Sequence, residues 1–270
     1  MNQTATSTLT DTSAAVLAQR DERGVLTLTM NRPGSFNALS EEMLEALQTE
    51  LDKAAQDSGL RAVVLAAAGK AFCPGHDLKQ MVSQPELAYY QKLFAQCSRM
   101  MLTIRKLSVP VIARVQGMAT AAGCQLVAQC DLAVSVDTAR FATSGIHYGL
   151  FCATPAVPLS RNIGTKQAME MLLTGDFISA QEALARGLVN RVVPAAELDA
   201  AVESLVKSIV QKPHTAIAMG KAMFYQQAEI GIEAAYQLAG QTMACNMMDP
   251  AAQEGFLAFT EKREPSWKKA

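Results

Sequence analysis

The sequence predicts an α/β core followed by a helical C-terminal region. Strand-like and amphipathic helical segments alternate through the first two-thirds of the 270 residues, whereas the last third is helical in pattern almost throughout. No linker rich in Pro, Gly or Ser separates the two parts. We therefore expect a flexible tail over residues 1–20, a core over 21–200 with parallel strand pairing, and a helical region over 201–270.

The first elements of the core follow from residue spacing. The segment VLTLTM at 25–30 alternates as a half-buried strand does. After the turn NRPGSFNA, Ser40 opens an amphipathic helix that runs to about Gln56. The run AVVLAAA at 62–68 is a buried strand, because it contains no polar residue, and the loop GKAFCPGHDL follows it.

The rest of the core continues the alternation. A helical pattern occupies about 86–107, and Pro110 restarts the chain as the strand VIARVQG. A Gly/Ala-rich stretch leads into a helix that ends near Asp131, and two strands follow, LAVSV and RFAT. From Gly164 onward the pattern is helical, with starts and stops marked by Thr165, Ser179 and Pro213, and by Gly175 and Gly187.

Composition excludes several classes of protein. The 24 Lys and Arg residues nearly balance the 25 Asp and Glu residues, which argues against a broad nucleic-acid or polybasic membrane surface. No uncharged apolar run reaches the ~20 residues that span a bilayer. The first residues lack the basic start and apolar stretch of a signal peptide. We expect a cytoplasmic protein that binds neither nucleic acid nor membrane.

The cysteines and histidines predict neither a disulfide framework nor a metal site. The six cysteines form no CxxC pair and lie mostly among apolar residues, so we expect reduced, packed thiols. The three histidines show no metal-ligand spacing. The apolar stretch AAYQLAGQTMACNMM indicates helices that pack either on another subunit or within the chain.

Two loops of the core combine small residues with amide groups that have no obvious partner. In KAFCPGHDL, at 70–78, the turn at Gly75 can leave the amide of His76 pointing into a cleft. In GMATAAGCQL, at 117–126, the small residues Ala121, Ala122 and Gly123 begin a helix, where amides lack internal partners and carry the positive end of the dipole. Two such amides would bind a carbonyl oxygen that becomes negative in a transition state.

Several motifs, in this order, resemble the crotonase (enoyl-CoA hydratase/isomerase) superfamily. They are NRPGSFNAL, GKAFCPGHDL, PVIARVQGMATAAGCQLVAQCDLAV and FTEKREPSW, and the resemblance covers residues 20–268. It implies a spiral of β-β-α turns with C-terminal helices that assemble trimers, often paired into hexamers. It also implies an acyl-CoA thioester as ligand, with no cofactor beyond the CoA moiety.

By position, the resemblance assigns the two oxyanion amides to His76 and Ala122. The family commonly has a small residue at the first position and Gly at the second. Because the donor is a backbone group, other side chains are compatible with the role. The methyl group of Ala122 would narrow the approach, and the His76 imidazole either lies over the CoA pocket or donates a proton.

The resemblance also supplies candidates for binding CoA. Lys70, Lys79 and Lys262 are candidates for the phosphates, with a solvated surface charge as the alternative for each, and Lys262 can come from a neighbouring subunit. The pantetheine and nucleotide path is expected along the first turn and the first oxyanion loop, at Ser35, Phe36, Gly75, Asp77 and Leu78.

Both glutamates that move protons in the hydratases of this family are absent. The first, within a GGCEL-like sequence, corresponds to Gln125, and the second, in an F-x-x-P-E-like stretch, corresponds to Gly145. Gln125 cannot transfer a proton, but it can orient a water or a substrate carbonyl, or bond the local backbone. Each positioned acid–base group is worth on the order of 10²–10⁴ in rate, so we expect weak hydration.

A further departure lies at 149–161, GLFCATPAVPLSR, where relatives often carry a Gly-rich helix entrance. Thr154, Pro155 and Pro158 stand there instead, which predicts a reshaped pocket floor. A thiolate at Cys152 activated by His147 is a less favoured alternative, because such a thiolate needs an adjacent base.

Three functional hypotheses follow. The first is an enzyme that acts on acyl-CoA thioesters by stabilising an oxyanion or enolate, through isomerisation, thioester hydrolysis or decarboxylation. The second is an acyl-CoA-binding protein with little catalysis. The third is ordinary hydratase activity, for which Gln125→Glu would leave the rate little changed.

Overall fold

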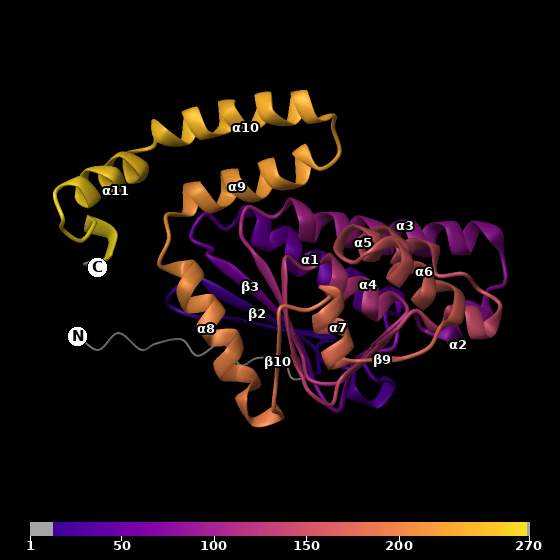
Figure 1. Cartoon of the computed structure of the whole chain (residues 1–270). Helices are drawn as coiled ribbons and strands as arrows, with labels where there is room; N and C mark the ends of the chain where they lie inside the picture. Colours follow the sequence, from indigo (N-terminus) through magenta and orange to yellow (C-terminus); the bar gives the residue numbers. More distant parts are fainter. Residues whose placement is uncertain (1–12, 269–270) are drawn as a thin grey trace, which may run out of the picture.

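The strands form two sheets in the computed structural model, which describes residues 13–268 (Figure 1). The larger sheet has the order β1-β2-β3-β5-β7-β10, with β1 at Val16–Arg20, β2 at Val25–Met30, β3 at Ala62–Ala67, β5 at Val111–Val115, β7 at Leu132–Val136 and β10 at Arg191–Val193. The smaller sheet has the order β4-β6-β8-β9, with β4 at Ala71–Cys73, β6 at Met118–Thr120, β8 at Arg140–Ala142 and β9 at Ile178–Ser179.

The predicted parallel pairing is confirmed for most strand pairs. β2 pairs with β3, β3 with β5, and β5 with β7 in parallel, as expected when helices connect successive strands. The smaller sheet pairs in the same way from β4 to β6 and from β6 to β8. The carboxyl ends of β4 and β6 therefore lie next to each other, and both candidate loops leave from these ends.

The N-terminal boundary of the core was predicted too late in the chain. Strand β1 lies inside the expected tail and pairs antiparallel with β2, with Val16 opposite Met30. The error arose because Gln19 and Arg20, near its exposed end, make this short edge strand look like polar tail. Residues 1–12 of the predicted tail lie outside the described residues.

The helices cover the sheets and then continue as an extension. Those of the core are α1 (Glu41–Gln56), α2 (Leu78–Ser83), α3 (Leu87–Lys106), α4 (Ala122–Gln129), α5 (Ala153–Asn162), α6 (Thr165–Thr174), α7 (Ala180–Arg186) and α8 (Leu198–Val210). Short 3₁₀ turns are η1 (Pro33–Ser35), η2 (Ser144–Tyr148), η3 (Ala195–Glu197) and η4 (Ser266–Lys268). Ser40 caps α1 as predicted, because its hydroxyl accepts a hydrogen bond from the amide of Met43 at 3.2 Å.

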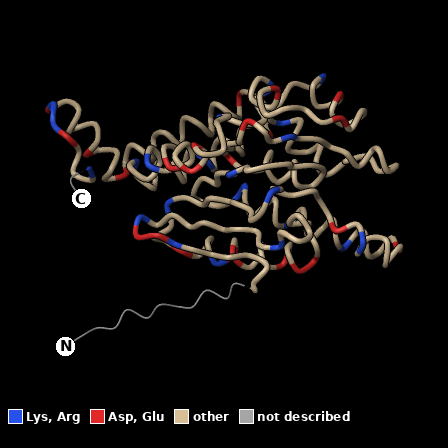
Figure 2. The backbone as a smooth tube through the Cα atoms, turned by 90° about the horizontal axis from the view of Figure 1, so that it is seen from below, with Lys and Arg blue, Asp and Glu red and all other residues tan. Residues whose placement is uncertain are grey.

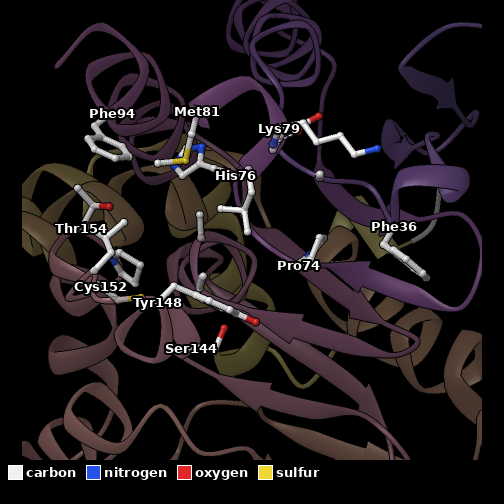
Figure 3. Close-up of a pocket in the computed structure, with 18 of the residues that line it drawn as sticks. Phe36, Pro74, His76, Lys79, Met81, Phe94, Ser144, Tyr148, Cys152 and Thr154 are labelled. Atoms are coloured by element: carbon white, nitrogen blue, oxygen red, sulfur yellow. Dashed lines mark hydrogen bonds between the residues drawn. The ribbon is translucent and has the colours of Figure 1, made fainter. Parts of the chain in front are cut away.

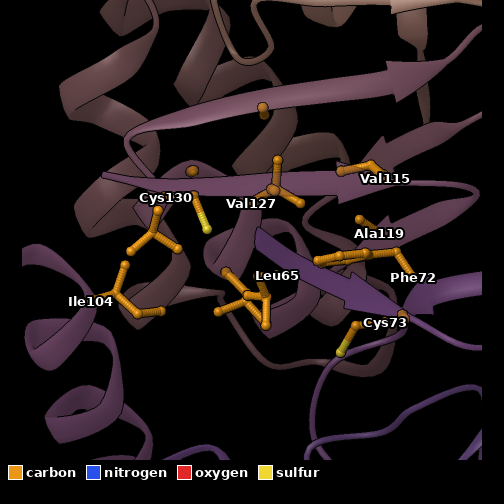
Figure 4. Close-up of a cluster of buried hydrophobic side chains, with 14 of the residues drawn as sticks. Leu65, Phe72, Cys73, Ile104, Val115, Ala119, Val127 and Cys130 are labelled. Carbon is orange, nitrogen blue, oxygen red and sulfur yellow. The ribbon is translucent and has the colours of Figure 1, made fainter. Parts of the chain in front are cut away.

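The main core fills the space between the sheets and the helices α1, α3 and α4. Figure 4 shows part of it, where Leu65 of β3, Phe72 of β4 and Val127 of α4 are almost completely buried. The six cysteines are free, and five of them are buried. Burial raises the pKa of the Cys73 thiol to about 12, so this thiol packs as a neutral apolar group, as predicted.

The C-terminal region begins later than residue 201, because that position falls inside α8. Three helices make up the extension: α9 (His214–Gln227), α10 (Ile232–Met247) and α11 (Pro250–Thr260). α9 lies along the core and α10 beside α9, whereas α11 extends away from the body (Figure 1). A buried network fixes α9 to the core, because Lys221 and Tyr225 each bond the carboxylate of Asp131 at 2.7 Å.

Charged residues of both signs are spread over the molecule rather than gathered on one face (Figure 2). This distribution agrees with the net charge of −1. Within residues 13–268, every helix is either too short or too polar to cross a bilayer.

Candidate functional site

A largely apolar cavity of about 540 Å³ lies where the two candidate loops meet. Figure 3 shows His76, Met81 and Phe94 on one side of it and Ser144 and Tyr148 on the other. The lining comes from η1, the loop after β4, α2, α3, the start of α4, η2 and the start of α5. Elements from widely separated parts of the sequence therefore build one site.

The first loop makes a sharp turn after β4. Gly75 has a φ of 103°, in the region that favours glycine, and its carbonyl accepts a hydrogen bond from the Leu39 amide at 2.8 Å. A methyl group built on Gly75 would lie 3.0 Å from the Ala121 Cβ and 3.2 Å from the Ala122 nitrogen. The loop thus rests directly on the second loop, and only glycine fits there without displacing it.

The second loop carries backbone strain at the point where α4 begins. Ala121 has φ 50° and ψ −121°, a conformation that is costly for any residue with a side chain. Its amide donates to the Ala142 carbonyl at 3.0 Å, which holds the loop against β8. At Gly123, an added methyl group would collide with the Cys73 carbonyl, so glycine permits the close contact between α4 and β4.

The amide N–H groups of His76 and Ala122 are free of partners among the described residues. Both residues line the cavity, and Ala122 is the first residue of α4, where the helix leaves its amides unpaired. The structure therefore brings together the two residues that the sequence singled out as backbone donors.

The His76 side chain forms part of the cavity wall. Its Nδ1 lies 3.3 Å from the Leu39 carbonyl oxygen, and its ring meets the Phe94 ring edge-on at a centroid distance of 5.4 Å. Burial lowers the pKa of the imidazole, which favours the neutral form. A carbonyl can only accept, so we assign the proton to Nδ1, which leaves Nε2 without one.

The two positions that the resemblance assigns to the hydratase glutamates are closed in different ways. Gln125 is buried under the cavity wall rather than lining it, and its Oε1 has no partner among the described residues. Gly145 does line the cavity, but a methyl group there would lie 2.6 Å from the Leu150 carbonyl oxygen and 2.8 Å from the Cys152 sulfur. With this backbone, a glutamate has no room at Gly145.

Most of the predicted CoA-binding residues lie at the cavity. Its lining includes Ser35, Phe36, Asp77, Leu78 and Lys79. The Asp77 carboxylate caps α2 by accepting from the amides of Lys79 at 2.9 Å and Gln80 at 3.3 Å, so it has a structural task.

Two of the predicted lysines lie outside the lining. Lys70 is next to it, because its Nζ stands 5.4 Å from the centroid of the Phe36 ring. Lys262 follows α11 on the extension and is not among the residues that line the cavity. Within one chain, the structure does not bring Lys262 to the site.

The structure provides no support for the alternative of a Cys152–His147 pair. Burial raises the pKa of the Cys152 thiol. His147 points elsewhere, because its Nε2 lies 2.9 Å from the place of a methyl group on Gly175. Without an adjacent base, the thiol stays protonated at neutral pH.

The cavity floor differs from a Gly-rich helix entrance, as predicted. α5 starts at Ala153, and Thr154 and Pro155 both line the cavity. Sequence reasoning placed Tyr148 and the segment 149–161 at the pocket floor, but it missed the opposite wall formed by Met81 and Phe94. These two residues lie in α2 and α3, where an apolar side chain looks like ordinary helix packing in the sequence.

Comparisons with known proteins agree with this architecture. The enoyl-CoA hydratase/isomerase family model matches residues 20–270. The chain is 43% identical over 248 residues to mouse mitochondrial enoyl-CoA hydratase domain-containing protein 3, covering 92% of this chain and 83% of the relative.

Solved structures of similar proteins have the same fold. The crystal structure of an enoyl-CoA hydratase from Mycobacterium smegmatis is 62% identical, with a TM-score of 0.93 over 94% of this chain and 99% of that one. Human enoyl-CoA hydratase domain-containing protein 3 is 42% identical, with a TM-score of 0.90 over 94% and 100% of the two chains.

The relatives contradict the expected cytoplasmic location, because the mouse, frog and human proteins are named as mitochondrial. The sequence argument failed because the lack of a secretory signal does not distinguish the cytosol from other compartments. The predicted family and fold are confirmed: the chain has the crotonase fold and belongs to the enoyl-CoA hydratase/isomerase family.

Proposed function

We propose that this protein binds acyl-CoA thioesters and acts on them by stabilising negative charge on the thioester oxygen, with little hydratase activity. The observation that carries the proposal is the pair of unbonded amides, of His76 and Ala122, at one apolar cavity. Hydrogen-bond donors fixed before the reaction stabilise an oxyanion without reorganising, and removing one such donor typically lowers a rate by about 10²–10³.

The surroundings of the two amides favour an anionic oxygen. Ala122 begins α4, so the positive end of the helix dipole adds to its amide. The mostly apolar lining lowers the local dielectric once a ligand fills the cavity, which strengthens each hydrogen bond to the oxygen. An enolate or a tetrahedral oxyanion would both be stabilised, which leaves isomerisation, thioester hydrolysis and decarboxylation as compatible reactions.

The proton-transfer half of the hydratase mechanism has no equivalent at the same positions. Gln125 has no acidic proton, and Gly145 has no side chain and no space for one. Hydration of a double bond needs a group to activate water and another to protonate carbon. We therefore expect turnover of crotonyl-CoA far below that of hydratases that carry both glutamates.

The CoA portion would follow the side of the cavity where Phe36 and Lys79 lie in Figure 3. Lys70 and Lys79 supply positive charge for the phosphates, and Phe36 offers an apolar face for the nucleotide. The acyl group would then lie toward Phe94, Cys152 and Thr154.

The extension would assemble trimers, or hexamers built from two trimers. α10 and α11 expose large apolar side chains, among them Tyr236 at 75%, Met243 at 70% and Phe259 at 83%. Soluble proteins seldom leave so much apolar surface uncovered. In such an assembly, Lys262 would lie near a neighbouring chain. Light scattering coupled to gel filtration measures the assembly, and a monomer at micromolar concentration would contradict it.

A second candidate function is an acyl-CoA-binding protein without catalysis. The closed positions at Gln125 and Gly145 favour it, because neither carries a group that transfers protons. The test combines thermal unfolding with a turnover screen over acyl-, enoyl- and malonyl-type CoA thioesters. Stabilisation with turnover supports the enzyme, stabilisation alone supports the binder, and no stabilisation by any CoA ester contradicts both.

A further inference from the structure

His76 carries an unused hydrogen-bond acceptor in the wall of the cavity. Its Nε2 is buried and has no partner, and no other cavity-lining side chain among the described residues carries a buried polar atom in that condition. The side chain as a whole is partly buried and faces Phe94 and Met81 at the same end of the cavity (Figure 3). Neither neighbour has a group that donates a hydrogen bond to nitrogen.

The state of the imidazole follows from its other nitrogen. Nδ1 lies 3.3 Å from the Leu39 carbonyl oxygen, and this oxygen is presented by the same backbone bridge that joins Leu39 to His76. Because the carbonyl needs a donor, Nδ1 holds the proton, and Nε2 of the neutral ring offers a lone pair. The ring is thus oriented as an acceptor by a rigid part of the backbone.

An unsatisfied acceptor inside a protein costs free energy, which a ligand recovers when it supplies the missing donor. The Ser144 hydroxyl on the opposite side of the cavity is already engaged, because it and the Thr120 hydroxyl bond each other at 2.7 Å. The amide and the imidazole of His76 belong to one residue. A donor that reaches Nε2 must therefore lie only a few carbon atoms from a carbonyl oxygen held by the amide.

We propose that His76 Nε2 accepts a hydrogen bond from a hydroxyl group on the acyl chain, so that the protein selects short hydroxyacyl-CoA thioesters over unsubstituted ones. This inference rests on the proposed function, because it places the thioester oxygen at the two amides. Met81, a flexible side chain on α2, and the Phe94 ring shape the apolar remainder of this end of the cavity.

The test measures dissociation constants by calorimetry for 3-hydroxybutyryl-CoA, 4-hydroxybutyryl-CoA and butyryl-CoA at pH 7.5. One hydrogen bond corresponds to about a three- to tenfold change in affinity, so at least one hydroxyacyl ester should bind that much more tightly than butyryl-CoA. His76→Phe keeps a ring of similar size and removes the acceptor, so it should abolish this preference. His147→Phe, at an exposed histidine outside the cavity, is the matched control and should keep it.

The outcomes separate this inference from the function on which it rests. If no CoA ester binds, both fail. If the esters bind with equal affinity, or if His76→Phe keeps the preference, only the inference is overturned. Should His76→Phe not fold, the methyl ethers of the two hydroxyacyl esters provide a second test on the wild-type protein. They retain the oxygen without the donor, and binding as tight as that of the parent hydroxy esters would overturn the inference.

Discussion

The backbone half and the side-chain half of the site differ in the chemistry that they allow. In the backbone half, Gly75 allows one loop to rest on the other, and His76 and Ala122 present free amides. In the side-chain half, Gln125 is buried and does not line the cavity, and Gly145 is packed against Leu150 and Cys152. A backbone donor survives most substitutions of its own residue, whereas an acid–base group is lost with a single one.

This difference shows that the two halves of the cavity depend on different kinds of contact. Anion stabilisation depends on loop geometry, and loop geometry depends on a few close contacts between β4, β6 and α4. Proton transfer depends on side chains that can be replaced without disturbing those contacts. Substitutions can therefore test the backbone half and the side-chain half separately.

The largest effect is expected from Gly75→Ala. The added methyl group would meet Ala121 and Ala122 at 3.0–3.2 Å, and the φ of 103° strains any residue with a side chain. We expect acyl-CoA affinity or turnover to fall by about 10²–10³, because both amides move. Gly220→Ala, on α9 with no atom within 4 Å of the added methyl, is the control and should retain both. If Gly75→Ala kept the acyl-CoA affinity and turnover of the wild type, the proposed role of the two loops in positioning the amides would be contradicted.

Gly145→Glu tests the closed half directly. The glutamate would have to displace the Leu150 carbonyl or the Cys152 sulfur, so we expect a loss of about 1–3 kcal/mol in unfolding free energy, as in overpacked sites. Hydration of crotonyl-CoA should stay near the wild-type level, even when combined with Gln125→Glu. If the double variant hydrated crotonyl-CoA as fast as hydratases that carry both glutamates, a glutamate at position 145 would have room to act, which contradicts the prediction.

Gln125→Glu alone makes a prediction about pH. A carboxyl group in this buried position has a raised pKa, because burial disfavours its charge. The folded form then binds its proton more tightly than the unfolded form, so stability relative to wild type falls as pH rises above about 4.3, the ordinary Glu value. Melting temperatures of both proteins at pH 5 and pH 8 provide the check. A variant as stable as wild type at pH 8 would indicate an unseen partner.

The smallest effect concerns His76 itself. Burial lowers the pKa of its imidazole below the ordinary 6.5, so the unfolded chain binds more protons than the folded one as the pH drops through that value. Stability should therefore decrease below pH 6.5, and His76→Phe should lessen this decrease. Urea unfolding at pH 7.5 and pH 5.5 measures the free energy of unfolding of both proteins. An equal loss of unfolding free energy between the two pH values in wild type and His76→Phe would refute the prediction.

Local patterns predicted much of the fold. Alternation and capping located β2, α1 and β3, and the Gly/Ala-rich run located α4, because these features depend on neighbours in sequence. The short strands β4 and β6 have too few residues to show a period, and β1 is polar at its exposed end. Their existence depends on pairing with distant strands.

The site was predictable to the extent that it depends on backbone loops. The resemblance pointed to His76, Ala122, Gln125 and Gly145 by motif position. It could not show that Gly145 is packed against Leu150, or that the Leu39 carbonyl fixes the His76 ring, because both contacts arise only in the folded chain. The same limit applies to the Cys152–His147 alternative, because only the folded chain shows that His147 lies against Gly175.

The most direct test of the account is the vibrational frequency of the bound thioester carbonyl. Difference infrared spectra of butyryl-CoA labelled with ¹³C at the carbonyl would be recorded free in water and bound to the protein. Two amides that hold the oxygen in an apolar cavity polarise the bond, so the bound frequency should be lower than that in water. A bound frequency equal to or higher than that in water would contradict the central claim.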